Sequence, residues 1–376
     1  MAYHPAWEEL GDSLRNVVPS SAYDPKIGAD LYHRYLDEWA LCDELGINIM
    51  VNEHHTTATC ATSVCTIPMA ILARETKNVR LLCLGMPIAN RMDAVRVAEE
   101  YAMLDVISRG RLEMGFVKGA PFEVSPANSN PATLMERFWE AHDLILKALT
   151  SHDGPFNWEG EHFQYRQVNV WPRPYQTPHP PVWMTVASPG SAKSVGEKGY
   201  VMASLNTGYA NTPTIFDSYR KGAEASGHAA TKDRFAYLAL VGVGETEEEG
   251  RRRASQILDY SRTTPRTAAQ FWFPPGYTSN EVTAQKLHNR SPLMIPLRDG
   301  GEFEMQTGSV DEFIDAGIAF AGTPDTVFEQ ICEFNEHVGG LGHLLMMGQG
   351  GHLSHEDTVA NLTLFSKEVL PRLKDL

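Results

Sequence analysis

The chain has 376 residues, enough for one large barrel or for two or three average domains, so length alone does not decide the domain count. Hydrophobic residues make up 43% of the chain and charged residues 21%, which argues against a disordered or fibrous protein. The formal net charge of -15 at pH 7 disfavours nucleic acid and anionic membranes as partners, because both would repel an acidic protein.

The start of the chain and its cysteines indicate a cytoplasmic protein that is not exported. Residues 1–10 include Glu8 and Glu9 and lack the basic and apolar regions of a signal peptide. The longest apolar stretch, residues 61–73, is shorter than the roughly 20 residues that a transmembrane helix needs. The five cysteines form no CxxC pair, so we expect reduced, mostly structural thiols.

Apolar strands alternate with amphipathic helices along the chain. Residues 31–45 have apolar side chains at helical spacing and stop at Gly46, after which residues 47–51 read as a strand. The later pairs of helix and strand are residues 68–74 with 79–86, 94–107 with 111–117, 134–149 with 182–186, 191–198 with 201–204, 212–225 with 235–243, and 324–337 with 343–347. This alternation predicts a parallel sheet in an α/β fold.

The strands that this pattern predicts number seven, one fewer than a closed (β/α)8 TIM barrel requires. No apolar strand precedes the first helix, so we expect the first strand to be short or absent. Residues 314–320 can fill the gap, although they read as a helix or a loop. The fold prediction is therefore one barrel domain over residues 1–376 with an irregular start.

Two insertions interrupt the alternation. Residues 155–181 predict a hairpin followed by an extended arm, because the prolines between residues 172 and 181 forbid regular strand pairing. Residues 262–311 carry the aromatic run Phe271-Trp272-Phe273 and show little periodicity. A long loop of this kind inside a compact domain is usually a lid or a binding loop.

The strand at residues 47–51 runs directly into Asn52, Glu53, His54 and His55. Catalytic groups of β/α barrels gather at the carboxyl ends of the strands, and histidine is the side chain that titrates near neutral pH. The alternative is that the two imidazoles only hydrogen-bond the loop backbone. The position at a strand end favours a site that contains at least one of them.

Several segments together resemble one family, the flavin-dependent bacterial luciferase-like monooxygenases. The matching segments are NEHH at residues 52–55, RVAEEYAMLD at 96–105, SRGRL at 108–112, GFVKG at 115–119, PPVW at 180–183, ASPGS at 187–191 and AGTP at 321–324. The resemblance implies a TIM barrel of the luciferase-like type that uses reduced FMN and O2. In that chemistry a peroxide on the flavin C4a carbon transfers one oxygen atom to a small organic substrate. It also implies a separate NAD(P)H:flavin reductase that supplies FMNH2, and a homodimer.

The resemblance implies site residues as well. It makes His54 and His55 the catalytic candidates, with Glu53 as a partner that can fix a histidine tautomer. Lys118 stands where the family usually has an arginine against the flavin phosphate, which weakens bidentate recognition. The expected cofactor-binding residues are Met86, Asn90, Val117, Lys118, Ser188, Gly190 and Ser191, and the expected substrate pocket contains Asn52, Glu53, Trp183, Phe271 and Trp272.

Each of these assignments has a simpler alternative. Lys118 can be a solvated loop lysine, Asn90 can make a turn, and Ser188 can be an ordinary helix N-cap rather than part of a phosphate cradle. No HxH or HExxH spacing is present, so we expect no metal site. Two other functions remain open: an F420-dependent hydride-transfer enzyme, and a catalytically silent flavin-binding protein.

Overall fold

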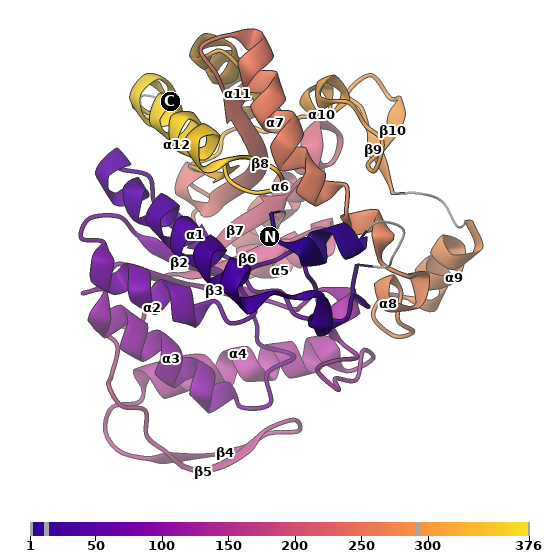
Figure 1. Ribbon diagram of the computed structural model, residues 1–376. Helices are drawn as coiled ribbons and strands as arrows, with labels where there is room; N and C mark the ends of the chain where they lie inside the picture. The colour runs from indigo at the N-terminus through magenta and orange to yellow at the C-terminus, as the bar shows by residue number, and fades with distance from the viewer. Residues whose placement is uncertain (1–2, 11–14, 290–292, 375–376) are drawn as a thin grey trace. The chain divides into compact units, whose positions relative to one another are not determined.

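The computed structural model describes residues 3–10, 15–289 and 293–374, and the chain divides into two compact units. We call residues 48–183 with 267–290 the central unit, and residues 1–47, 184–266 and 291–376 the terminal unit. Both consist mainly of parallel strands that alternate with helices (Figure 1). A single domain over residues 1–376 remains a prediction.

The central unit begins with three parallel strands, in which β1 pairs with β2 and β2 with β3. All seven residues of β2 are buried, as expected for a parallel strand that is covered on both faces. A helix follows each strand, and Asp93 caps the second of these helices by accepting a hydrogen bond from the Arg96 N–H (3.0 Å). The elements are β1 (Ile49–Val51), α2 (Thr66–Glu75), β2 (Leu81–Pro87), α3 (Ala94–Ile107), β3 (Leu112–Val117), η3 (Pro121–Glu123) and α4 (Leu134–Thr150).

The first insertion has the predicted structure. Strands β4 (Phe156–Glu159) and β5 (Gln164–Val168) form an antiparallel hairpin, which projects beyond α3 and α4 (Figure 1). Residues 169–181 follow without a regular helix or strand. The Glu140 carboxylate on α4 anchors the hairpin by accepting hydrogen bonds from the Trp158 indole and from the backbone N–H groups of His162 and Phe163.

The second insertion is more regular than we predicted. Residues 262–311 contain η5 (Thr264–Arg266), α8 (Ala269–Trp272), α9 (Asn280–Asn289) and a hairpin of β9 (Met294–Pro296) and β10 (Glu302–Glu304). These elements have only three to ten residues, so the apolar periodicity that reveals a helix or strand is weak. The interpretation of this segment as one long irregular loop was wrong.

The terminal unit contains five parallel strands around β8, which pairs with β7 at residues 235–238, with β12 at residues 236–240 and with β11 at residues 240–243. The strands are β6 (Val182–Val186), which starts in the central unit, β7 (Val201–Leu205), β8 (Phe235–Val243), β11 (Ala319–Gly322) and β12 (His343–Met347). The helical segments are η1 (Pro5–Leu10), η2 (Ser20–Ala22), α1 (Pro25–Leu45), α5 (Pro189–Glu197), α6 (Gly208–Ala225), η4 (Lys232–Arg234), α7 (Glu247–Ser261), α10 (Val310–Asp315), α11 (Pro324–His337), α12 (His355–Leu364), the π-helical η6 (Phe365–Val369) and α13 (Leu370–Leu373).

These eight parallel strands and their helices confirm the predicted α/β fold of the (β/α)8 TIM-barrel type. Residues 3–10 and 15–24 contain only 3-10 helices and turns, which agrees with a first strand that is short or absent. The eighth strand is β11, which lies at the end of the segment that we read as a helix or loop. That reading was partly wrong, because α10 ends at Asp315 and a four-residue strand follows it.

Most other errors concern element boundaries. Helix α1 starts six residues earlier than predicted, because Asp24 caps it and Pro25 occupies its first turn. Helix α6 begins at Gly208 rather than Thr212, although Pro213 lies inside it. Proline cannot donate to the carbonyl four residues earlier, but the His337 ring supplies this donor to the Tyr209 carbonyl (3.0 Å).

No helix in the described part of the chain is both long and apolar enough to span a bilayer.

Candidate active site

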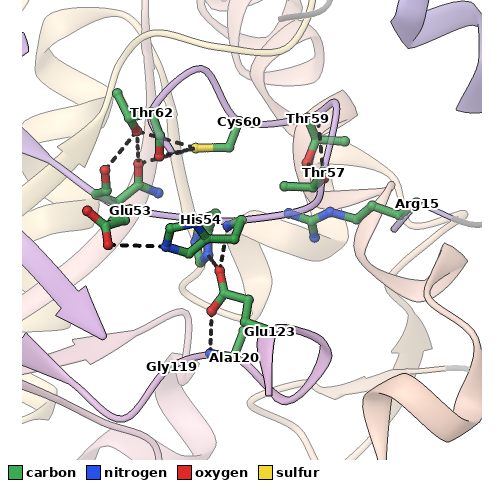
Figure 2. A network of polar contacts seen from close by, with 12 residues as sticks. Arg15, Glu53, His54, Thr57, Thr59, Cys60, Thr62, Gly119, Ala120 and Glu123 are labelled. Carbon is green, nitrogen blue, oxygen red and sulfur yellow. Dashed lines mark hydrogen bonds and ion pairs between the residues drawn. The ribbon is translucent and has the colours of Figure 1, made fainter. Parts of the chain in front are cut away.

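The loop after β1 is held in shape by its own hydrogen bonds. The backbone N–H of His54 donates to the Thr62 carbonyl (3.1 Å), and the Thr62 hydroxyl donates to the Asn52 carbonyl (2.7 Å). Cys60 contacts the Asn52 side chain through its sulfur (Figure 2). The loop therefore presents the two histidines from a folded segment rather than from a free one.

Glu53 is buried and has several protein partners. One terminal nitrogen of Arg91 contacts both carboxylate oxygens (2.9 and 3.0 Å), and the Cys65 backbone N–H donates to Oε2 (3.0 Å). The Nε2 atom of His55 lies 3.1 Å from Oε1. Burial opposes ionisation of Glu53, but the hydrogen bond from His55 and the charge of Arg91 outweigh it and lower the pKa. The same hydrogen bond raises the pKa of His55 despite its partial burial. These contacts favour Glu53 as a partner of His55.

A second carboxylate, Glu123, contacts both histidines. Its Oε1 atom accepts a hydrogen bond from the His55 backbone N–H (2.8 Å) and lies 3.2 Å from Nδ1 of His54. Its Oε2 atom accepts from the Ala120 backbone N–H (2.7 Å), so the carboxylate joins two loops (Figure 2). Burial opposes its ionisation, but the bonds from His54, His55 and Ala120 outweigh that cost and lower the pKa of Glu123.

Lys118 follows β3 directly, and its ammonium lies 3.5 Å from the centre of the Tyr277 ring. The Tyr277 hydroxyl donates to the Gly119 carbonyl (2.7 Å), which fixes the ring next to the lysine. Burial lowers the pKa of Lys118 to about 8. Within the described residues no carboxylate forms an ion pair with Lys118, so this cation is available to an anionic ligand.

Asn90 lies next to this lysine segment. Both polar atoms of its amide are buried and have no hydrogen-bond partner among the described residues. Its Nδ2 atom would be 2.5 Å from a Cβ at Gly119, where φ is +99°, so only glycine fits there. A buried amide without partners is costly, which makes Asn90 a candidate ligand-binding group. Met86, in the preceding strand, is fully buried, and Val117 is half-buried.

An aromatic cluster lies beside the histidines. The Phe122 ring stacks on Trp272 of α8 (6.2 Å between centroids, 11° between planes) and also contacts His54 (6.2 Å). Phe271 precedes Trp272 in the same short helix and is half-buried. Trp272, which we predicted as a pocket residue, is therefore linked to His54 through the Phe122 ring.

Trp183 belongs to a different group. It is buried, and its indole N–H donates to Glu113, which also pairs with Arg80. These contacts give Trp183 a packing role in the central unit and leave its assignment to the substrate pocket as a prediction.

The proposed phosphate cradle lies in the terminal unit, just after β6. Ser188 is the N-cap of α5 and accepts a hydrogen bond from the Ser191 N–H (3.3 Å), while the two hydroxyls lie 3.1 Å apart. Space for a Cβ is open at Gly190, and the segment is mostly exposed. Both the simple cap and an open helix N-terminus that can bind an anion are therefore present.

Some residues of this site were missed by the sequence interpretation. Arg91 and Glu123 contact predicted site residues, yet neither was identified from the sequence. The available signal for Glu123 was an acidic residue a few positions beyond the β3 strand end. Among the described residues, Glu136, Glu161 and His162 could together hold a metal ion, but both carboxylates are exposed and none of the three takes part in the site contacts above.

The chain is similar in sequence to known flavin-dependent and F420-dependent enzymes. Over 180 residues the chain is 28% identical to the oxygenase component of flavin-dependent trigonelline monooxygenase from Acinetobacter baylyi, covering 47% of this chain and 49% of that protein. Over 315 residues it is 24% identical to the F420-dependent glucose-6-phosphate dehydrogenase of Amycolatopsis mediterranei, covering 82% and 83%.

A solved structure shows the same fold. The oxygenating constituent of 3,6-diketocamphane monooxygenase from Pseudomonas putida, a type II Baeyer-Villiger enzyme in complex with FMN, superimposes with a TM-score of 0.70 at 20% identity. The match covers 91% of this chain and 93% of that chain. The sequence model of the family described as luciferase-like monooxygenase matches residues 19–340. The chain therefore belongs to the luciferase-like monooxygenase family.

Proposed function

We propose that the protein is the oxygenase of a two-component monooxygenase, which binds reduced FMN from a separate reductase and oxygenates a small organic substrate. The observation that carries this proposal is the pair of histidines at the end of β1, each held by a buried carboxylate. Groups that titrate near neutral pH are needed where oxygen is reduced and a proton must be supplied. The named relatives include oxygenases that use flavin.

The residues near Lys118 fit a flavin. Among the residues that the structure describes, the ammonium has no carboxylate partner, which suits a phosphate. Within the same residues the buried Asn90 amide has no hydrogen-bond partner, and the edge of a flavin ring offers both a donor and an acceptor. The exposed N-terminus of α5 at Ser188 is a further candidate for the phosphate. The further cofactor-binding candidates are Met86 and Val117 in the central unit and, separately, Gly190 and Ser191 in the terminal unit. Reduced flavin supplies the electrons that activate O2.

The protein's own part is to orient the substrate, exclude water and move a proton. In this proposal the His54 and His55 pair transfers the proton. Phe271, Trp272 and Phe122 form the apolar wall of the substrate pocket. Asn52 lies on the same loop and remains a pocket candidate. Such a wall suits an apolar or aromatic substrate. A cytoplasmic location stays a prediction.

Anaerobic titration with reduced FMN, followed by rapid mixing with O2, tests this function. We expect reduced FMN to bind and its reoxidation to be slower than that of free flavin, because a closed site excludes water and delays peroxide release. Screened substrates should speed the reoxidation and incorporate label from 18O2. Reduced F420 is titrated in parallel, since one relative is an F420-dependent dehydrogenase.

The outcomes separate the candidate functions. Binding of F420 with no reaction toward O2 would support hydride transfer instead. Slow reoxidation that no substrate accelerates would support a silent flavin-binding protein. Failure to bind reduced FMN at all would contradict the monooxygenase.

We also propose a homodimer that forms through α2 and α3. These helices of the central unit expose large apolar side chains at helical spacing, which is unusual for a surface that faces only water. Ile67 on α2 is 62% exposed and Met103 on α3 is 51% exposed. The other exposed members are Ile71, Val106 and Ile107.

Sedimentation velocity tests the dimer. The wild-type protein should sediment with twice the mass of one chain, and the double variant Ile67→Glu, Met103→Glu should sediment as a monomer, because two charges would be buried in each half of the interface. The matched control is Tyr175→Glu, which changes another exposed apolar side chain of the central unit outside both helices. A monomeric wild type, or a dimer that both variants retain, would contradict this interface.

A further inference from the structure

Glu123 has an unusual position for a residue that no motif marked. It is 2% exposed, and it contacts the ring of one histidine and the backbone of the next. We propose that Glu123 is a positioning residue that fixes His54 as the Nδ1–H tautomer and leaves its Nε2 atom free to exchange a proton with the reacting groups. The catalytic part of this inference rests on the proposed function, whereas the tautomer does not.

Ionised Glu123 can only accept hydrogen bonds. An ionised carboxylate has no proton to donate, so every neighbour within hydrogen-bond distance must be a donor. Oε2 accepts from the Ala120 N–H and Oε1 from the His55 N–H. The third neighbour is Nδ1 of His54, 3.2 Å from Oε1. Nδ1 must therefore carry a proton, and in the neutral ring Nε2 then has the lone pair.

The adjacent histidine, His55, contacts a different carboxylate through its other ring nitrogen. Glu53 contacts His55 through Nε2, so the same reasoning places the proton of neutral His55 on Nε2. The two neighbouring rings are thus held in opposite tautomers by two different carboxylates. Glu53 has Arg91 as a counter-charge, whereas no arginine or lysine among the described residues forms an ion pair with Glu123.

The two histidines also differ in the position of the ring nitrogen that can exchange a proton. The His54 side chain is 29% exposed, and its Nε2 atom has no hydrogen-bond partner in the described part of the chain. The free nitrogen of His55 is instead Nδ1, which lies close to its own backbone. His54 therefore offers its proton-exchanging atom at the tip of the ring.

The substitution Glu123→Gln should disturb this arrangement, because an amide has one acceptor end and one donor end. If the amide oxygen faces His54 and His55, the NH2 group meets the Ala120 N–H. If the oxygen faces Ala120, the NH2 group meets the His54 ring and favours a lone pair on Nδ1. Either orientation places two donors against each other or reverses the tautomer.

Nitrogen NMR of the full chain labelled with 15N-histidine tests the proposal without flavin. Spectra are taken near pH 8 to 9, where most histidines are neutral, and His54 is assigned with the variant His54→Gln. We expect Nδ1–H at His54 in the wild type, and a fall of about tenfold in the ratio of Nδ1–H to Nε2–H in Glu123→Gln, since a bond to a charged acceptor is lost. Glu140→Gln is the matched control, because Glu140 also accepts three hydrogen bonds but none from a histidine ring.

Either Nε2–H at His54 in the wild type, or an unchanged ratio of Nδ1–H to Nε2–H in Glu123→Gln, would overturn the proposal. Should Glu123→Gln fail to fold, the wild-type spectrum and Glu53→Gln still decide it: Glu53→Gln should alter His55 and leave His54 as Nδ1–H. Glu123→Asp, which keeps the charge, should retain part of the wild-type ratio. Because these spectra need no cofactor, a wrong tautomer and a failed monooxygenase assay are separate results.

Discussion

The substitution Arg91→Ala is expected to destabilise the protein by about 3 kcal/mol at pH 7, because it leaves the charge of Glu53 buried without its guanidinium partner. The Arg91 side chain is 25% exposed and that of Glu53 is fully buried, so solvent screens this pair weakly. One guanidinium nitrogen contacts both carboxylate oxygens. Urea unfolding at several pH values measures the loss.

The effect should depend on pH in one direction. Glu53 has a lowered pKa in the folded protein, so it contributes stability above the pKa of an unfolded glutamate, and this contribution is lost as pH falls through the folded pKa. In Arg91→Ala the carboxyl loses one cause of that shift and can protonate more readily. The difference in unfolding free energy between wild type and variant should therefore be largest above about pH 5 and shrink toward pH 3.

Arg96→Ala is the matched control. Arg96 pairs with Glu99 on the surface of α3 at 2.9 Å, with the arginine side chain 64% exposed. Such a pair contributes at most about 0.5 kcal/mol, with little change between pH 5 and pH 8. If the two arginine variants lost the same free energy of unfolding, the pair of Arg91 and Glu53 would stabilise the protein no more than a surface ion pair does.

The sequence was sufficient for elements whose apolar pattern is long. The strands at residues 182–186, 235–243 and 343–347 and the helices at 94–107 and 324–337 have the predicted bounds. Strand β11 has four residues and no alternation, so it could not be separated from a loop. Helix α6 starts before its proline, and the Tyr209 carbonyl that the proline cannot bond accepts a hydrogen bond from His337, 128 residues away, which local sequence cannot show.

The same limit applies to the candidate site. His54 and His55 could be predicted because they directly follow a strand, and strand ends place side chains in a known part of the fold. Arg91 and Glu123 lie 38 and 69 positions from their partners Glu53 and His54, so only the folded loops bring them together. The sequence also did not show which carboxylate holds which histidine. Partners of this kind depend on loop paths, which leave no periodic signal.

Lys118→Met is expected to weaken the binding of FMN by about 10- to 100-fold and to leave riboflavin binding nearly unchanged. Under the proposed function the ammonium contacts the phosphate, and a charge-assisted hydrogen bond contributes about 1.5 to 3 kcal/mol. Riboflavin lacks the phosphate, so it reports on the ring site alone. Fluorescence titration with both flavins measures the ratio of their dissociation constants in each variant.

The pH dependence of FMN binding provides an independent check. Burial lowers the pKa of Lys118 to about 8, so the fraction of charged lysine in the free protein falls as pH rises through that value. FMN affinity should therefore decline between about pH 7 and pH 9 in the wild type, whereas Lys118→Arg should hold its affinity because arginine stays charged. Riboflavin affinity should show no such decline.

Lys147→Met is the matched control for Lys118→Met. Lys147 also lies over an aromatic ring of the central unit, 4.7 Å from the centre of Phe156, but on α4 and the hairpin rather than at a strand end. Replacing Lys147 should change the affinity for neither FMN nor riboflavin. An equal loss of FMN and riboflavin affinity in Lys118→Met would mean that the lysine acts by packing against Tyr277 and not by its charge. The phosphate would then have to be bound elsewhere, and the N-terminus of α5 is the next candidate.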